Sequence, residues 1–204
     1  MSDPRPTPKP WPMKWIVLVI VLSLGAYTWI TLHYRKVNPA FAPYGDMKDR
    51  ANTQRLLAAG FQRIAIRVER PADPQPAPGH ASITAATPGL PEDLRVTLLD
   101  QPVLPAAYER VAAADAINAF FPYLIEFSDL STDHRYQPGP AMIYLREGEL
   151  IIVPELEKLS GDLQARGRDN RVRLTIPAGA LKPGQYAVRL VGARSSQAWT
   201  LQVH

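Results

Sequence analysis

The sequence predicts a mainly β protein: a single N-terminal transmembrane helix, a short juxtamembrane helix, and then an antiparallel β-sandwich with minor helices. Three observations support this fold class. Residues 15–32 carry no charged side chain. The 21 prolines exceed the usual share of about 5% and disfavour long helices. Short stretches that alternate apolar and polar side chains recur from residue 63 to the end of the chain, as in half-buried strands.

Charge and composition exclude several classes of protein. The formal net charge of +4 arises within the first 36 residues, and the rest of the chain has equal numbers of basic and acidic side chains. A nucleic-acid-binding protein needs a basic face to neutralise phosphates, so we expect no nucleic acid partner. The absence of cysteine excludes disulfides, thiolate metal sites, iron–sulfur clusters and thiol catalysis. No cofactor is expected.

Residues 15–34 are predicted to form the transmembrane helix. As a helix, the uncharged segment would be roughly 27 Å long, close to the ~30 Å hydrocarbon core of a bilayer. Lys14 and Arg35 flank it, and tryptophan and tyrosine lie near both ends, where interfacial aromatics are common. Apolar side chains continue well beyond Gly25, so the segment is interpreted as a retained signal anchor rather than a cleaved signal peptide. Residues 1–14 form a Pro-rich tail that is too short to fold.

The orientation of this helix follows from two opposed observations. More Lys and Arg residues follow the helix than precede it, which favours a cytoplasmic C-terminal domain. The layout favours the opposite arrangement, because a short tail and one helix precede a long domain that can be translocated largely regardless of its charge. We therefore expect a bacterial inner-membrane protein with a cytoplasmic N-terminus and a periplasmic domain.

Small and hydroxyl side chains gather at the centre of the same helix. They are Ser23, Gly25, Ala26 and Thr28. Small residues let two helices approach closely, and hydroxyls can hydrogen-bond across a helix pair. These residues are candidates for packing against a membrane partner or a second copy, although membrane helices also tolerate glycine without any such role.

Residues 35–60 are predicted to contain a juxtamembrane helix. Asp46 suits its N-cap and Gly60 its C-cap. A weak apolar stripe would be formed by Met47, Ala51 and either Leu57 or Ala58. The helix is either a lever beside a membrane partner or a stalk that packs on its own domain, and the second interpretation is preferred.

Residues 61–204 are predicted to form the β-domain. Strands are expected at 63–69, 94–100, 123–130, 141–154, 172–177, 185–192 and 198–204. The segment 141–154 reads as a hairpin that turns at Glu147-Gly148. Residues 106–118, which follow Pro105, are predicted to be helical, and 154–167 could hold a short helix interrupted at Gly161. Because strands and helices do not alternate, an antiparallel sandwich is favoured.

The last two predicted strands have clear inward faces. Alternation places Tyr186, Val188 and Leu190 on one strand, and Trp199, Leu201 and Val203 on the other, toward the core. Trp199 is therefore expected to be buried. A Pro-Gly turn followed by Gln185 and Tyr186 precedes the penultimate strand. This corner resembles the last hairpin of immunoglobulin-like domains in bacterial envelope proteins, which implies an immunoglobulin-like sandwich. The layout and the segment "YRKVNPAF" resemble FixH-type accessory proteins of the cbb3 cytochrome oxidases, which implies an accessory role.

No motif predicts catalysis. The histidines lack metal-ligand spacing, and there is no nucleophile elbow or nucleotide-binding loop, so we expect no enzyme. The loop 129–138 gathers Asp129, Asp133, His134 and Tyr136. A carboxylate and an imidazole could ligate a metal, but polar loops usually carry such residues for solvation and turn formation.

The preferred function is a non-catalytic, membrane-anchored domain that binds or scaffolds a protein partner at the cell envelope. One alternative is an accessory or assembly subunit of an integral membrane complex such as a terminal oxidase. Others are a metal or ligand carrier that uses the 129–138 loop, and an envelope hydrolase.

Overall fold

The computed structural model describes residues 12–33, 43–64, 66–70, 79–129, 133–161 and 170–204. The chain divides into two compact units, 1–45 and 46–204. In the first unit, helix α1 (Met13–His33) is long and apolar enough to cross a membrane, and none of its residues is buried. A helix of 21 residues spans roughly 31 Å, which matches the thickness of a hydrocarbon core.

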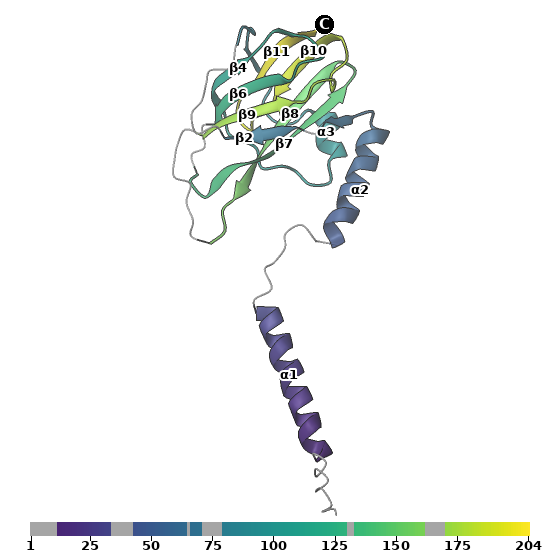
Figure 1. Ribbon diagram of the computed structural model, residues 1–204. Helices are drawn as coiled ribbons and strands as arrows, with labels where there is room; N and C mark the ends of the chain where they lie inside the picture. The colour runs from purple at the N-terminus through teal and green to yellow at the C-terminus, as the bar shows by residue number, and fades with distance from the viewer. Residues whose placement is uncertain (1–11, 34–42, 65, 71–78, 130–132, 162–169) are drawn as a thin grey trace, which may run out of the picture. The chain divides into compact units, whose positions relative to one another are not determined.

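The second unit, hereafter the domain, is mainly β, as predicted (Figure 1). One sheet contains β1 (Gln62–Ile64), β3 (Thr84–Ala86), β5 (Ala116–Ile117), β7 (Tyr136–Arg146), β8 (Glu149–Lys158), β10 (Gly184–Leu190) and β11 (Ser196–Val203). Its order is β1-β7-β8-β10-β11-β3, and β5 also pairs with β11. The other sheet contains β2 (Arg67–Glu69), β4 (Tyr108–Ala113), β6 (Tyr123–Asp129) and β9 (Asn170–Ile176), in the order β2-β9-β6-β4. We call them the seven-stranded and the four-stranded sheet.

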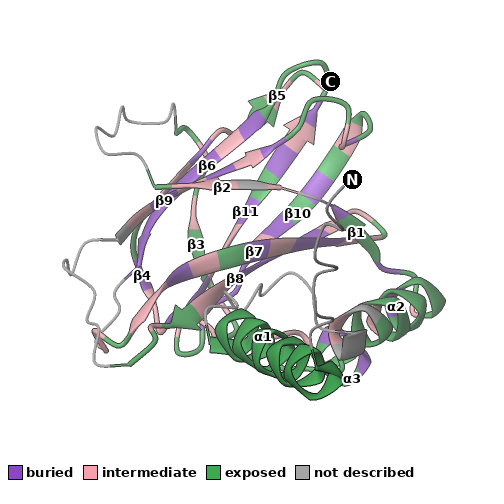
Figure 2. Cartoon of the chain, turned by 60° about the horizontal axis from the view of Figure 1, so that its bottom comes forward, coloured by how far each residue is buried: buried purple, intermediate pink, exposed green. Residues whose placement is uncertain are grey.

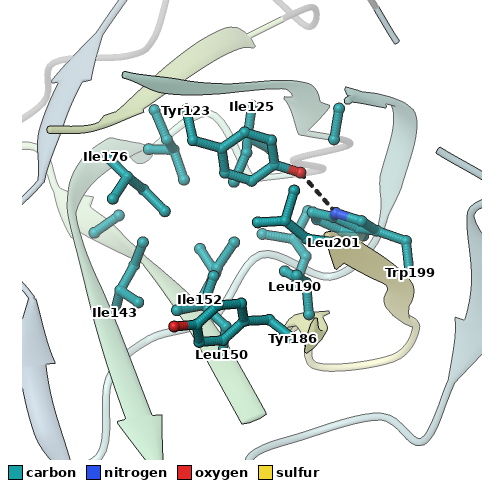
Figure 3. Packing of buried hydrophobic residues seen from close by; sticks show 14 of the residues in the cluster. Tyr123, Ile125, Ile143, Leu150, Ile152, Ile176, Tyr186, Leu190, Trp199 and Leu201 are labelled. Atoms are coloured by element: carbon teal, nitrogen blue, oxygen red, sulfur yellow. Dashed lines mark hydrogen bonds between the residues drawn. The ribbon is translucent and has the colours of Figure 1, made fainter. Parts of the chain in front are cut away.

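The two sheets pack against each other around one apolar core (Figure 3). The inward faces of β10 and β11 are those predicted, with Tyr186 to Leu190 and Trp199 to Val203 buried at alternate positions. Trp199 is only 4% exposed, and its Nε1–H donates a hydrogen bond to the Tyr123 hydroxyl at 2.9 Å. A buried indole needs such a partner for its N–H group. The prediction that Trp199 is a core residue is confirmed.

A second apolar cluster covers the opposite face of the seven-stranded sheet. Helix α2 (Pro43–Ala58) and helix α3 (Glu92–Thr97) pack there through Leu56 and Leu94 (Figure 2). Strand β8 is therefore buried on both faces: Leu150 and Ile152 lie in the core, whereas Ile151 and Val153 belong to the second cluster. A continuous apolar run is the pattern of a strand that is covered on both sides.

Helix α2 was predicted, but its inward face was not. Met47 and Leu57 are 71% and 63% exposed, whereas Leu56 is 2% exposed and Ala59 packs beside it. The helix begins at Pro43 and so includes the predicted cap Asp46, and Gly60 follows its end with a φ of 81°, as expected of a C-cap glycine. The C-terminal half of α2 packs on its own domain, in agreement with the preferred interpretation.

Two secondary-structure predictions are wrong. Residues 94–100 were expected to form a strand, but α3 occupies most of this segment. Its first turn is acidic, which favours a helix start, and Leu94 and Leu98, four residues apart, are both buried. Residues 106–118 were expected to be helical, but they form β4 and β5. The pairing of β4 with β6 and the complete burial of Ala113 outweigh the helix propensity of an alanine-rich segment.

The sheets also depart from a simple antiparallel arrangement. The predicted strand 63–69 is divided, because β1 pairs with β7 in one sheet and β2 with β9 in the other. A chain that changes sheets in this way forms a corner between them. The β8–β10 and β5–β11 pairs are parallel, so the seven-stranded sheet is mixed. The segment 154–158, considered for a short helix, continues β8, and residues 162–167 lie outside the described residues.

The predicted hairpin at 141–154 is confirmed. Strands β7 and β8 are joined by Glu147 and Gly148, with Arg146 paired to Glu149. Both turn residues have positive φ, at 50° and 82°, as a two-residue type I′ turn requires.

Candidate functional site

Two adjacent phenylalanines project from the turn between β5 and β6. Phe120 is 85% exposed and Phe121 is 67% exposed. Contiguous exposed apolar surface is characteristic of sites that contact another molecule, which makes this aromatic pair a candidate for such a site. We call residues 118–121 the Phe turn.

The backbone of the Phe turn is held by hydrogen bonds within the turn and to two other parts of the domain. The Asn118 side-chain oxygen accepts from the Phe120 N–H, and the Asn118 carbonyl accepts from the Phe121 N–H, both at 3.0 Å. The Ala119 N–H donates to the carbonyl of the C-terminal residue His204 at 2.9 Å, and the Ala119 carbonyl accepts from the Gly179 N–H at 2.8 Å. The turn is thus tied to the end of β11 and to the loop before β10.

A turn held in this way can present two aromatic rings with little loss of backbone entropy on binding. Aromatic residues are enriched among those that contribute most to protein–protein affinity, and preorganisation lowers the cost of association. The chemistry available at the Phe turn is apolar contact with a partner surface, without a titratable side chain. The sequence contains a signal for it, since two phenylalanines stand next to each other and do not fit a strand alternation. The pair lies in the short connection between the helix expected at 106–118 and the strand expected at 123–130.

The four residues singled out in the 129–138 loop do not form one site. Asp129 ends β6 and is only 1% exposed, whereas the Asp133 side chain is 40% exposed and pairs with Arg135 at 2.9 Å. Tyr136 begins β7, His134 is partly exposed, and residues 130–132 lie outside the described residues. Neither Asp133, His134 nor Tyr136 lines the cavity that Asp129 faces. Within the described residues, no group of three or more potential metal ligands is brought together.

Asp129 has an unusual environment. Its carboxylate oxygens have no hydrogen-bond partner among the described residues, and the group lines a cavity of about 10 Å³ with Phe127 and Val172. That volume is at the lower limit of the about 10–15 Å³ that one water needs. Burial raises the pKa of Asp129 to about 6, because desolvation disfavours the charged carboxylate. Burial, and then the negative charge of Asp129, raises the pKa of the neighbouring Tyr108.

The candidate helix-packing residues Ser23, Gly25, Ala26 and Thr28 all lie within α1 and are exposed. A Cβ added at Gly25 would meet nothing within 4 Å, so the isolated helix has room for a side chain there.

No protein-family model, curated protein or solved structure matches this chain.

Proposed function

We propose that the protein is a non-catalytic, membrane-anchored domain that binds a protein partner at the cell envelope through the Phe turn. The observation that carries this proposal is the exposure of Phe120 and Phe121 on a backbone held by hydrogen bonds. Leu57 is also well exposed, but it lies on the outer side of a helix as a single apolar side chain, which is common on protein surfaces.

The position of the Phe turn within the domain supports a contact with a partner. The turn lies beside the C-terminus, and α2 begins at the other end of the domain (Figure 1). The binding surface would therefore be separate from the segment through which the chain enters the domain.

The proposal includes an immunoglobulin-like fold for the domain. The Tyr186 hydroxyl donates to the Lys182 carbonyl, four residues upstream, at 2.8 Å. A tyrosine that bonds back to the backbone before a strand resembles the tyrosine corner of immunoglobulin-like sandwiches. This contact supports the likeness of the Pro-Gly-Gln-Tyr corner to those domains.

We place the protein in the bacterial inner membrane with its N-terminus in the cytoplasm and the domain in the periplasm. The apolar helix α1 supports the membrane location. The expected result is that a C-terminal fusion to alkaline phosphatase is active and a fusion to a fluorescent protein that folds only in the cytoplasm is dark. A fluorescent, phosphatase-inactive pair of fusions would reverse the orientation.

An accessory or assembly subunit of an integral membrane complex, such as a terminal oxidase, is a second candidate. It is favoured by α1, whose surface is exposed on all sides and whose centre has the small residue Gly25. In this case recognition would reside in the helix rather than in the Phe turn.

The test of the Phe turn is site-specific photo-crosslinking of the full chain in cells. A photoreactive phenylalanine analogue at position 120 or 121 should give a discrete crosslinked protein, whereas the same analogue at Leu57 should not. Replacement of both phenylalanines by serine should reduce co-purification of that protein at least tenfold, since each buried aromatic contact contributes about 1–2 kcal/mol or more. Crosslinks to lipid alone, or the same product from position 57, would rule out a protein contact at this turn.

A further inference from the structure

The part of the chain that the structure describes contains one carboxyl group that is buried without a hydrogen-bond partner, that of Asp129. Asp129 is the last residue of β6 and is 1% exposed. It shares the inward face of β6 with Ile125 and Phe127, because side chains alternate along a strand. The carboxyl group therefore lies between the two sheets, at the opposite end of β6 from the Phe turn, and is separate from the proposed binding surface.

The cavity that Asp129 faces offers a carboxylate neither a donor nor room for more than one water. Its volume is about 10 Å³, and residues of both sheets line it. Three of the lining residues, Pro105, Pro138 and Pro154, are prolines and have no backbone N–H to donate. The N–H of a fourth, Leu156, already donates to the Val103 carbonyl at 2.7 Å. A charge placed in this cavity therefore bears most of its desolvation cost.

No cationic side chain lines the cavity from the described elements that pack against Asp129. The only other titratable lining residue is Glu155 on β8, whose carboxylate would repel a charged Asp129. Strands β2, β7 and β9 and the Pro105 segment contribute only uncharged residues to the lining. On β4, Tyr108 lies directly opposite Asp129. Burial raises the pKa of Asp129 to about 6, as expected of a carboxyl group that no cation stabilises.

Tyr108 links this end of the four-stranded sheet to the other sheet. Its ring packs edge-to-face on Phe127, with centroids 5.1 Å apart, and its hydroxyl donates to the Val191 carbonyl at 2.5 Å. Val191 directly follows β10 of the seven-stranded sheet. Strand β4 is the last strand in the order of its own sheet, and its pairing with β6 shifts register between Tyr108 and Arg110. Such an irregularity interrupts the ladder, so the start of β4 has few backbone hydrogen bonds to lose on local opening.

We propose that Asp129 is a pH-dependent switch that keeps this end of the sandwich closed while its carboxyl group is protonated and opens it when the group ionises. Opening separates the start of β4 from β6 and breaks the contact between Tyr108 and Val191, so that water enters between the sheets and hydrates the carboxylate. The neutral carboxyl group fits the apolar cavity at a much lower cost than the carboxylate, because only water or a donor can offset the charge there. The core around Trp199 stays packed in both states.

The direction and the size of the effect follow from the acidity of Asp129 in the two states. Its pKa is about 6 in the closed state, against an ordinary value of 3.8 once water reaches the group. The bound proton therefore favours the closed state in full below about pH 4, and this contribution is lost as the pH rises to about 6. The ratio of open to closed molecules should increase about 100-fold in total, and roughly 25-fold of this lies between pH 4.5 and pH 7.5.

The test measures how fast a buried thiol is labelled in the full chain in detergent, which has no cysteine of its own. Val172→Cys places the thiol in the cavity beside Asp129, and Val188→Cys places it in the core on β10; both positions are buried. The reagent is dithiodipyridine, which reacts at acidic and neutral pH, and each rate is corrected for that of an unfolded thiol peptide. Val172→Cys should be labelled roughly 25-fold faster at pH 7.5 than at pH 4.5. At pH 7.5 it should also be labelled at least about tenfold faster than Val188→Cys, which only global unfolding exposes.

Further variants in the Val172→Cys background assign the groups. Asp129→Asn should remove the pH dependence of labelling, whereas the matched control Asp115→Asn, at an exposed position, should keep it. Tyr108→Phe removes the hydroxyl contact with Val191 and should speed labelling about fivefold at both pH values; an unchanged rate would overturn the part assigned to Tyr108.

Hydrogen exchange of the wild type gives the same decision if a variant fails to fold. After correction for intrinsic rates, the amides of β4 should lose protection roughly 25-fold from pH 4.5 to pH 7.5 and should stay less protected than those of β10. Equal labelling of the two thiols would show that only global unfolding exposes the cavity, and it would overturn the proposal. Labelling of Val172→Cys that does not change with pH, or a pH dependence that survives Asp129→Asn, would overturn it as well.

Discussion

Replacing Asp129 with asparagine should stabilise the domain at neutral pH and remove a pH dependence that the wild type shows. The Asp129 carboxyl is 1% exposed, and its oxygens have no hydrogen-bond partner among the described residues. Burial raises its pKa from 3.8 to about 6. Asparagine has a similar shape and never carries the charge, so it avoids the desolvation cost of the ionised form.

The magnitude follows from the linkage between protonation and folding. Because the pKa of Asp129 is higher in the folded state than in the unfolded state, the folded state binds the proton more tightly. The bound proton therefore stabilises the folded state, and this contribution is present in full only below about pH 4. It is lost as the pH rises from about 4 to about 6 and stays lost above that range. A shift of about two pKa units corresponds to about 3 kcal/mol. We compare the free energy of unfolding of Asp129→Asn with that of the wild type at each pH. The difference, variant minus wild type, should increase by about 2 kcal/mol from pH 4.5 to pH 8.

The assay is denaturant unfolding of residues 46–204 at several pH values. Trp199 is the only tryptophan in this part of the chain, and it is buried against Tyr123, so its fluorescence reports the transition. Asp133→Asn is the control. A hydrogen bond with Arg135 lowers the pKa of Asp133, so the ionised carboxylate stabilises the folded state. Removing the carboxylate should therefore lower the free energy of unfolding at neutral pH, and only weakly because the side chain is exposed to solvent. A difference between Asp129→Asn and wild type that is constant from pH 4.5 to pH 8 would refute the reasoning, because it would show that Asp129 keeps its ordinary pKa.

Three further predictions concern the core, α2 and α1. Trp199→Ala should lower the free energy of unfolding by about 3–5 kcal/mol in circular dichroism measurements, since it removes a buried ring; a change of a few tenths of a kcal/mol would show that the ring is not packed. Leu56→Ala should cost about 2–5 kcal/mol, because Leu56 anchors α2 on the sheet, whereas Leu57→Ala on the exposed side should stay within about 0.5 kcal/mol; equal effects would contradict the docking of α2. Gly25→Leu should release a membrane partner or a second copy in detergent while insertion is retained, measured by co-purification and carbonate extraction; full retention of the complex would show that α1 is only a tether.

The local pattern of apolar, polar and turn-forming residues predicted those elements that have one buried face or a characteristic turn. The charge-free run of α1, the Glu147-Gly148 hairpin and the alternation that buries Trp199 were all evident, because each depends on residues close together in the chain. The candidate residues Asp129 and Asp133 were also identified in the sequence. The sequence could not predict their environments, because the Asp129 carboxylate is buried in the domain and the Asp133 carboxylate, four positions later, faces solvent.

Contacts between distant segments account for what the sequence could not predict. Residues 94–97 are helical because α3 covers the outer face of β7 and β8, and residues 108–113 are extended because they pair with β6. The inward face of α2 depends on the same outer face of the sheet, which accepts Leu56 rather than Leu57. A groove beside Tyr144 joins three parts of the chain that are far apart in sequence, namely α2 with β1, the segment after α3, and the β7–β8 hairpin. The periodicity of a sequence predicts which residues of one element are buried. It does not predict which other element covers them, because that depends on how the whole chain packs.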